Sequence, residues 1–256
     1  MQRPGELSPA VSVIMPAYNC EKYIEEAIRS VMVQTFTDWE LIVLDDGSSD
    51  STREIIERLA AEDARIISMP NEKNMGVAKT RNRGFDISRG RYVALLDSDD
   101  IWRSEKLECQ IKKIQSENAD LCYCSYAIID SDGINVKRDY SVPEKVDFNE
   151  LLKENHIGCS TVLISREALG ERRFLTDYYH EDYVMWLDML RTGAVAVGCT
   201  ETLAEWRYLR NSRSFNKKKS AKNRWDIYRN HLKLSRAYSL QLFLSYAIRG
   251  IRKYFK

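Results

Sequence analysis

Three carboxylates stand within four positions of "RYVALLDSDDIW", residues 91–102, at Asp97, Asp99 and Asp100. The stretch begins as an apolar strand, so these acids follow directly on a buried element. Acids that crowd at the edge of a core repel one another unless a cation neutralises them. Carboxylate and phosphate oxygens are the ligands of Mg²⁺ or Mn²⁺. The alternative is an acidic turn that caps the next helix, but a cap needs one Asp rather than three.

Two further clusters could hold the rest of a ligand. In "VLDDGSSDST", Asp45 and Asp46 end an apolar run, and either could accept a hydrogen bond from a base N–H or a ribose hydroxyl. The same residues would also suit a plain strand–turn–helix junction. In "PAYN", Tyr18 could stack on a nucleobase or lie on the surface as an ordinary tyrosine. Neither GxGxxG nor GxxxxGK[ST] occurs after the first strand, so the common phosphate loops are excluded.

A cation and a base could come from two other stretches. Arg81, in "NMGVAKTRNRG", could bind a diphosphate through its planar guanidinium or lie on a solvated helix face. Glu181 and Asp182, in "YYHEDYVMWLDML", open an amphipathic helix, where acids are stabilised by the helix dipole. Asp182 could instead act as a general base. The neighbouring His180 is weak evidence by itself.

Strands and helices must alternate to position these residues. Apolar runs predict strands at 11–17, 39–46, 65–70, 91–97 and 120–130, and helical periodicity predicts helices at 21–34, 51–62, 77–89 and near 104–117. This alternation predicts an α/β fold with a mostly parallel sheet flanked by helices. The polar clusters follow three of the strands, and in such sheets ligands bind beyond the carboxyl ends of the strands.

The second half of the chain is more mixed. We expect a strand leading into a short helix at 160–169, an amphipathic helix at 181–192, and two strands at 194–200 and 202–209. Residues 216–239 and 240–256 are both helical by periodicity.

The charge of the chain is divided unevenly. The formal net charge is +1, but residues 210–256 hold 14 Lys/Arg and one acid, which leaves the first 209 residues at −12. This basic tail suggests an anionic partner such as a membrane or a nucleic acid. The six cysteines show no zinc spacing, and no apolar signal core or membrane span is present. We therefore expect a cytoplasmic, reduced protein.

Together, "VSVIMPAYNCEKYIEEAIRSVMVQTFTDWELIVLDDGSSDST", "NMGVAKTRNRG", "RYVALLDSDDIW" and "HEDYVMWLDMLR" resemble family 2 glycosyltransferases with the GT-A fold. Within the family the chain looks most like bacterial enzymes of teichuronic-acid, capsule and O-antigen synthesis, the TuaG-like group. The likeness covers nearly the whole chain. It implies a catalytic domain at 1–209, with a nucleotide-sugar half at about 1–100 and an acceptor half at about 101–209, and a basic helical extension at 210–256.

The resemblance also implies roles for single residues. Asp182 would be the catalytic base, with Glu181 beside it, and Tyr18 would stack on uracil. The expected donor-binding residues are Pro16, Tyr18, Asn19, Asp46, Arg81, Asp97 and Ser98. Asp99, Asp100 and Asp97 would form the DXD-type site for Mn²⁺ or Mg²⁺, with the register of the ligands left open.

The reaction implied is an inverting transfer from a nucleotide sugar, with UDP as the expected nucleotide, to a glycan or polyprenyl-diphosphate-linked acceptor. The sugar and acceptor stay open, as does homodimer formation, and no nucleic acid is expected. Two alternatives remain: a DxD-type phosphotransferase or phosphatase, whose nucleophilic Asp would normally follow the first strand, and a non-catalytic membrane- or nucleic-acid-binding protein.

The tail has two interpretations. Residues 240–256 place Leu240, Phe243, Leu244, Ala247, Ile248 and Ile251 on one side, with Arg249, Arg252, Lys253 and Lys256 near the end. Such a helix could lie on anionic lipid at the inner face of the cytoplasmic membrane or pack on the catalytic body. Residues 211–219 could form a loop whose Lys and Arg cover the donor diphosphate.

Overall fold

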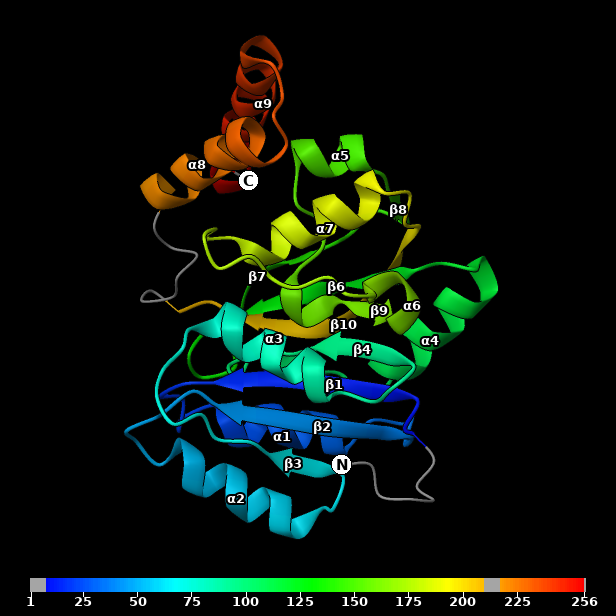
Figure 1. Cartoon of the computed structure of the whole chain (residues 1–256), viewed down its shortest axis with the longest axis vertical. Helices are drawn as coiled ribbons and strands as arrows, with labels where there is room; N and C mark the ends of the chain where they lie inside the picture. The colour runs from blue at the N-terminus through cyan, green and yellow to red at the C-terminus, as the bar shows by residue number, and fades with distance from the viewer. Residues whose placement is uncertain (1–7, 210–216, 256) are drawn as a thin grey trace.

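A sheet of ten strands runs through the computed structural model of the protein, with helices on both of its faces (Figure 1). The structure describes residues 8–209 and 217–255, with side chains up to residue 246. In spatial order the strands are β3(Ile66–Ser68), β2(Trp39–Asp45), β1(Val11–Ala17), β4(Tyr92–Leu95), β9(Leu163–Ser165), β6(Leu121–Ile129), β10(Ala196–Arg207) and β5(Ile101–Trp102), with β7(Asn135–Tyr140) beside β6 and β8(Lys145–Val146) beside β10.

The sheet is mostly parallel, as the sequence predicted. Strands β3, β2, β1 and β4 pair in parallel, and so do β6 and β10. Strand β9 lies between β4 and β6 and is antiparallel to both, so the flanking strands share one direction. The carboxyl ends of β1, β2, β4, β6 and β10 therefore face the same edge of the sheet.

The helices cover two separate cores. They are α1(Ile24–Met32), α2(Thr52–Glu62), α3(Val77–Ile87), α4(Lys106–Glu117), α5(Phe148–Lys153), α6(Arg166–Leu169), α7(Glu181–Arg191), α8(Lys217–Asp226) and α9(Arg236–Phe255). Because side chains alternate along a strand, Val13 of β1 packs in one core with α1, α2 and α4. Its neighbour Ile14 faces the other core, with α3, α5 and α7. Both faces of the sheet are thus apolar and buried.

Gly84 lets α3 approach the sheet closely. A Cβ at this position would lie 2.5 Å from Cγ2 of Ile14 and 3.2 Å from Cδ1 of Leu44. On an exposed helix, Gly→Ala would stabilise the fold, because glycine loses more backbone entropy. Here we expect Gly84→Ala to lower the free energy of unfolding by about 1–3 kcal/mol through overpacking. Urea denaturation measures the change, and a gain in stability would contradict this account of α3 packing.

Two expectations for the second half were wrong in detail. The stretch predicted as two strands is one strand, β10, with register shifts between Cys199 and Thr202 and between Thr202 and Ala204. These irregularities interrupt the alternation that marks a continuous strand. The helix predicted over 216–239 is also broken: α8 is followed by the π-helical turn Ile227–His231 and, before α9, by Lys233 at φ +55°.

The described part of α9 packs partly on the catalytic body, and the predicted contact with lipid stays a prediction. Leu242 is buried against the body, whereas Leu240 and Leu244 are 52% and 53% exposed. No helix among the described residues is long and apolar enough to cross a bilayer. Residues 210–216, most of the predicted diphosphate-covering loop, lie outside the described residues. The side chains of the predicted basic cluster at 249–256 also lie outside them.

Candidate active site

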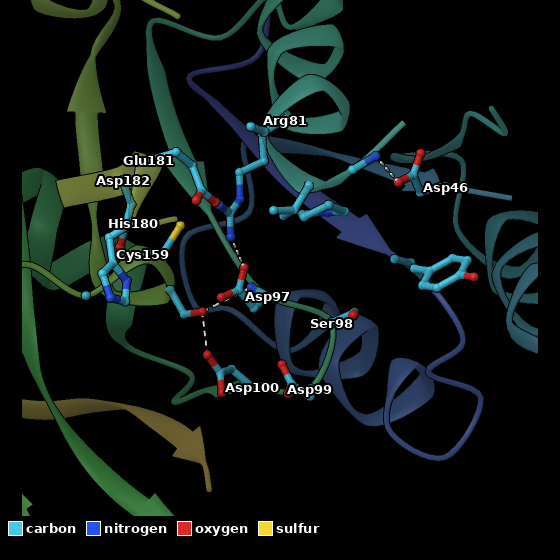
Figure 2. A pocket seen from close by; sticks show the side chains of 18 of the residues that line it. Asp46, Arg81, Asp97, Ser98, Asp99, Asp100, Cys159, His180, Glu181 and Asp182 are labelled. Atoms are coloured by element: carbon cyan, nitrogen blue, oxygen red, sulfur yellow. Dashed lines mark hydrogen bonds and ion pairs between the residues drawn. The ribbon is translucent and has the colours of Figure 1, made fainter. Parts of the chain in front are cut away.

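A cavity of about 730 Å³ opens at the carboxyl edge of the sheet, a volume typical of small-molecule sites. The predicted site residues that line it are Pro16, Tyr18, Asp46, Arg81, Asp97, Ser98, Asp99, Asp100, Glu181 and Asp182. Most of them follow the ends of strands β1, β2 and β4, Arg81 lies on α3, and Glu181 and Asp182 open α7 (Figure 2). Asn19 does not line the cavity. Its side chain accepts a hydrogen bond from the Ser49 amide, so it ties the loop after β1 to the loop after β2.

Asp46 organises one wall of the cavity. Its carboxylate accepts hydrogen bonds from Nδ2 of Asn71 at 2.7 Å and from the backbone amides of Met75 and Gly76, both at 2.9 Å. These bonds fix the loop that leads into α3. Tyr18 lines the cavity and is 51% exposed, so its ring is accessible to a planar ligand.

Arg81 joins the two acidic motifs of the cavity. Its guanidinium is buried, with Nη2 2.5 Å from Oδ1 of Asp97 and Nη1 2.8 Å from Oε1 of Glu181 (Figure 2). The sequence suggested that this cation binds a diphosphate directly. In the structure its two terminal nitrogens instead hold carboxylates, one after β4 and one at the start of α7. Arg81 therefore fixes the distance between these motifs.

Asp97 and Asp99 are the acids best placed to hold a cation. Burial, followed by the nearby charge of Asp97, raises the pKa of Asp99 to about 6. A divalent cation would relieve this repulsion. The residues described hold no group of three His, Cys, Asp or Glu side chains arranged around a metal position. Mg²⁺ and Mn²⁺ commonly take only one or two carboxylates and complete their coordination with phosphate oxygens and water, so Asp97 and Asp99 fit such an ion.

Asp100 has a different environment from Asp99. Its Oδ2 accepts a hydrogen bond from Oγ of Ser160 at 2.5 Å, and its Oδ1 accepts one from the backbone amide of Arg207 at 2.9 Å. The same serine hydroxyl accepts a bond from the Asp97 amide at 3.0 Å. Both carboxylate oxygens of Asp100 thus serve the fold of the loop after β4. This geometry favours the register in which Asp97 and Asp99, rather than Asp100, face a metal.

Glu181 and Asp182 are also neighbours with different surroundings. Glu181 is buried in its ion pair with Arg81, which makes it a poor proton acceptor. Burial and the adjacent charge of Glu181 raise the pKa of Asp182 to about 6, although the charge of Arg81 opposes the rise. A carboxylate with a pKa near neutrality, at the wall of a cavity, is suited to general-base catalysis.

Several residues of the site gave no signal in the sequence. Ser160 and Arg207 hold the acidic loop through Asp100, and Arg207 also donates to the Asp99 carbonyl at 2.9 Å and to Oε2 of Glu26 at 2.6 Å. A buried arginine is a reasonable partner for an acidic motif. However, nothing in the sequence shows that Arg207, at the end of β10, reaches the loop after β4.

A family model described as "Glycosyl transferase family 2" matches residues 12–173. Curated relatives match nearly the whole chain. The putative teichuronic acid biosynthesis glycosyltransferase TuaG of Bacillus subtilis is 38% identical over 96% of this chain and 97% of its own. The UDP-Glc:alpha-D-GlcNAc-diphosphoundecaprenol beta-1,3-glucosyltransferase WfgD of Escherichia coli is 40% identical over 95% of this chain and 94% of its own.

Solved structures share the fold at lower identity. S. aureus TarS 1-349 in complex with UDP-GlcNAc gives a TM-score of 0.74 at 20% identity, over 93% of this chain and 71% of that one. The mannosyltransferase PcManGT from Pyrobaculum calidifontis, in complex with GDP-Man and Mn²⁺, gives 0.69 at 19% identity, over 90% and 66%. The family match ends before α7, so it does not include Glu181 and Asp182.

Proposed function

The chain belongs to glycosyltransferase family 2 and has the GT-A fold, and on this premise we propose that it is an inverting transferase of cell-surface polysaccharide synthesis. It would move a sugar from a UDP-sugar to a sugar on a lipid diphosphate. The observation that carries this proposal is the cavity in which the acids after β4 and those at the start of α7 share Arg81.

The donor would occupy the side of the cavity formed by β1, β2 and β4. Tyr18 offers a ring for the base, and the Asp46 carboxylate offers acceptor oxygens for its N–H groups. Asp97 and Asp99 would hold Mn²⁺ or Mg²⁺ against the diphosphate. When bound, the metal neutralises negative charge on the departing diphosphate. TarS in complex with UDP-GlcNAc and PcManGT in complex with Mn²⁺ support this arrangement.

Asp182 would take the proton from the acceptor hydroxyl as its oxygen attacks the anomeric carbon. The bond from that carbon to the diphosphate oxygen breaks at the opposite face, so one displacement inverts the anomeric centre. Arg81 pairs with Glu181 and with Asp97 and so holds α7 against the acidic loop, which sets the position of Asp182 relative to the donor. No covalent intermediate with the protein is needed.

The proposed acceptor class is supported by the relative WfgD, whose name gives alpha-D-GlcNAc-diphosphoundecaprenol as its acceptor. Exposed Leu240 and Leu244 of α9, with the basic residues of the tail, would place the chain on the inner face of the cytoplasmic membrane, where such an acceptor is embedded. A phosphotransferase of the DxD type has less support, because the first strand is followed by "YNC" rather than by an acidic nucleophile.

The direct test is a panel of nucleotide sugars with and without Mn²⁺, read by thermal shift and then by transfer to decyl-diphosphate-linked GlcNAc. We expect a UDP-sugar to stabilise the protein in the presence of metal, and NMR of the product to show a β-linkage from an α-linked donor. A retained anomeric configuration, or no transfer with any nucleotide sugar, would refute the proposal.

Transfer should depend on pH through Asp182. Because the base must be ionised and its pKa is about 6, kcat/KM for the acceptor should be flat above about pH 7 and fall about tenfold per unit below pH 6. The profile should be recorded at two saturating concentrations of metal. If the fall in rate came from protonation of the proposed metal ligand Asp99, its midpoint pH would change with metal concentration, because metal and proton compete. If it comes from Asp182, the midpoint pH should be the same at both concentrations.

A further inference from the structure

A second, smaller pocket of about 210 Å³ lies beside the catalytic cavity. It is lined by Asn155, His180, Tyr183, Lys217, Ser220, Arg224 and Tyr246. His180 lines both hollows, and Tyr183 follows the proposed base Asp182 directly on α7. Neighbouring residues at the start of α7 therefore line the catalytic cavity and the second pocket. Of the other lining residues, Lys217, Ser220 and Arg224 belong to α8 and Tyr246 belongs to α9, the two C-terminal helices that lie together in Figure 1.

One face of α8 supplies the polar groups of this pocket. Lys217, Ser220 and Arg224 are spaced by three and four residues, so they lie along the same side of the helix. Lys218 and Lys222 lie on other sides of α8. They are exposed and do not line the pocket. The pocket side of the helix carries two cations and a hydroxyl.

Arg224 is buried with an unsatisfied donor. It is 7% exposed, and its guanidinium carbon lies 3.8 Å from the ring centroid of Tyr183 and 4.7 Å from that of Tyr246. Nη1 of Arg224 and Oγ of Ser220 are both buried without a hydrogen-bond partner in the described part of the chain. No carboxylate there forms an ion pair with Arg224. Such groups cost free energy in a folded protein unless something else pairs with them.

We propose that this pocket binds the diphosphate of the lipid-linked acceptor, an inference that rests on the function proposed above. A guanidinium fork, an ammonium group and a hydroxyl are the donors that bind phosphate oxygens. The contacts of the Arg224 guanidinium with the rings of Tyr183 and Tyr246 restrict where the fork can lie. The unsatisfied Nη1 and Oγ would donate to the phosphates, and Lys217 at the rim would add a second positive charge.

The position of the pocket fits the acceptor better than the donor. The donor diphosphate would lie at Asp97 and Asp99, where a metal neutralises it. The acceptor sugar must reach Asp182, and the second pocket is on the side of α7 where Tyr183 and His180 continue from that base. Its helices also carry the exposed Leu240 and Leu244, so a lipid chain attached to the diphosphate would leave the pocket beside an apolar helix surface.

The kinetic test compares two acceptors, α-GlcNAc-diphosphate with a decyl chain and decyl α-GlcNAc, which lacks the diphosphate. We expect Arg224→Met to raise KM for the diphosphate acceptor by about 10–100-fold, the size of one or two charged hydrogen bonds. Ser220→Ala and Lys217→Gln should raise it by about threefold to tenfold. KM for decyl α-GlcNAc and for the UDP-sugar should stay as in the unchanged protein.

A matched control and a stability measurement separate this role from a structural one. Lys218→Gln and Lys222→Gln remove the same charge from the same helix and should leave KM unchanged. Ser220→Ala removes a buried hydroxyl without a partner, so it should not lower the melting temperature. If Ser220→Ala and Lys217→Gln, in folded protein, leave KM for the diphosphate acceptor unchanged while transfer proceeds, the site assignment is wrong and the proposed function stands.

A binding experiment tests the pocket without any transfer. Titration calorimetry of the whole protein with decyl diphosphate, without divalent metal, should show binding that Arg224→Met weakens at least tenfold. Saturating UDP should leave this binding in place. If UDP abolishes it, the diphosphate occupies the donor site and the proposal fails. If binding follows Arg224 but no sugar is transferred, the pocket is a diphosphate site and the proposed function is wrong.

Discussion

Replacement of Asp182 by asparagine is expected to lower kcat for transfer by about 10²–10⁴-fold, the range typical of a lost general base. The substitution keeps the size of the side chain but removes the proton acceptor whose pKa lies near 6. Binding of UDP, measured by calorimetry, should stay within about twofold, because the donor binds on the other side of the cavity. Turnover equal to that of the unchanged protein would refute Asp182 as the base.

Asp188→Asn is the matched control for this change. Asp188 lies on the same helix, outside the cavity, where its carboxylate contacts Nε2 of His231 at 2.8 Å. It should therefore have nearly unchanged kcat. Glu181→Gln separates the two neighbouring acids: it breaks the buried pair with Arg81, so we expect it to lower stability as well as kcat. If Glu181→Gln lost kcat while Asp182→Asn stayed active, Glu181 rather than Asp182 would be the base.

Asp99→Asn is expected to lower transfer by about 10²–10³-fold at standard Mn²⁺ concentrations, because the metal contributes several kcal/mol to the transition state. The dependence of rate on metal concentration is the specific measurement. The midpoint of that titration should move to higher Mn²⁺, and UDP binding should lose its dependence on metal. An unchanged midpoint in folded Asp99→Asn protein would remove this residue from the metal site.

Asp100→Asn tests the register of the acidic motif. Because both oxygens of Asp100 accept hydrogen bonds within the protein, an asparagine would have to turn a donor toward Ser160 or Arg207. We expect a lower melting temperature and a lower kcat, with the metal midpoint unchanged. A shift of the midpoint in Asp100→Asn, and none in Asp99→Asn, would show that the other register is correct.

The sequence predicted the first half of the fold well because each of its elements has a clear period. The five strands there and the helices between them occur where apolar runs and helical spacing place them. It could not predict that β9 enters between β4 and β6, because an apolar run of three residues contains no information on its partners or direction. The single strand β10 was missed for a related reason: its bulges break the alternation on which the prediction depends.

For the site, the sequence identified which residues gather but not what each one touches. The resemblance to family 2 glycosyltransferases implied that Asp99 and Asp182 serve one site, and both line the same cavity. It did not show that Asp97 and Glu181 share the nitrogens of Arg81, because the contact with Glu181 joins residues 100 positions apart. The second pocket was invisible for the same reason. A lysine, a serine and an arginine on a basic helix have nothing unusual in their sequence, and only burial without a partner distinguishes Ser220 and Arg224.

Arg207 has a consequence for how the protein folds. Its side chain contacts Glu26, 181 positions earlier, and its backbone and side chain hold Asp99 and Asp100, more than 100 positions earlier. Contacts between residues so far apart in the sequence form slowly, because the entropy of closing a long loop is lost before the contacts can stabilise the fold. During synthesis, the acidic loop can therefore reach its final shape only after the ribosome has released β10. We expect the acidic loop, the proposed metal site, to be among the last parts of the molecule to become ordered, long after β4, the strand that precedes it.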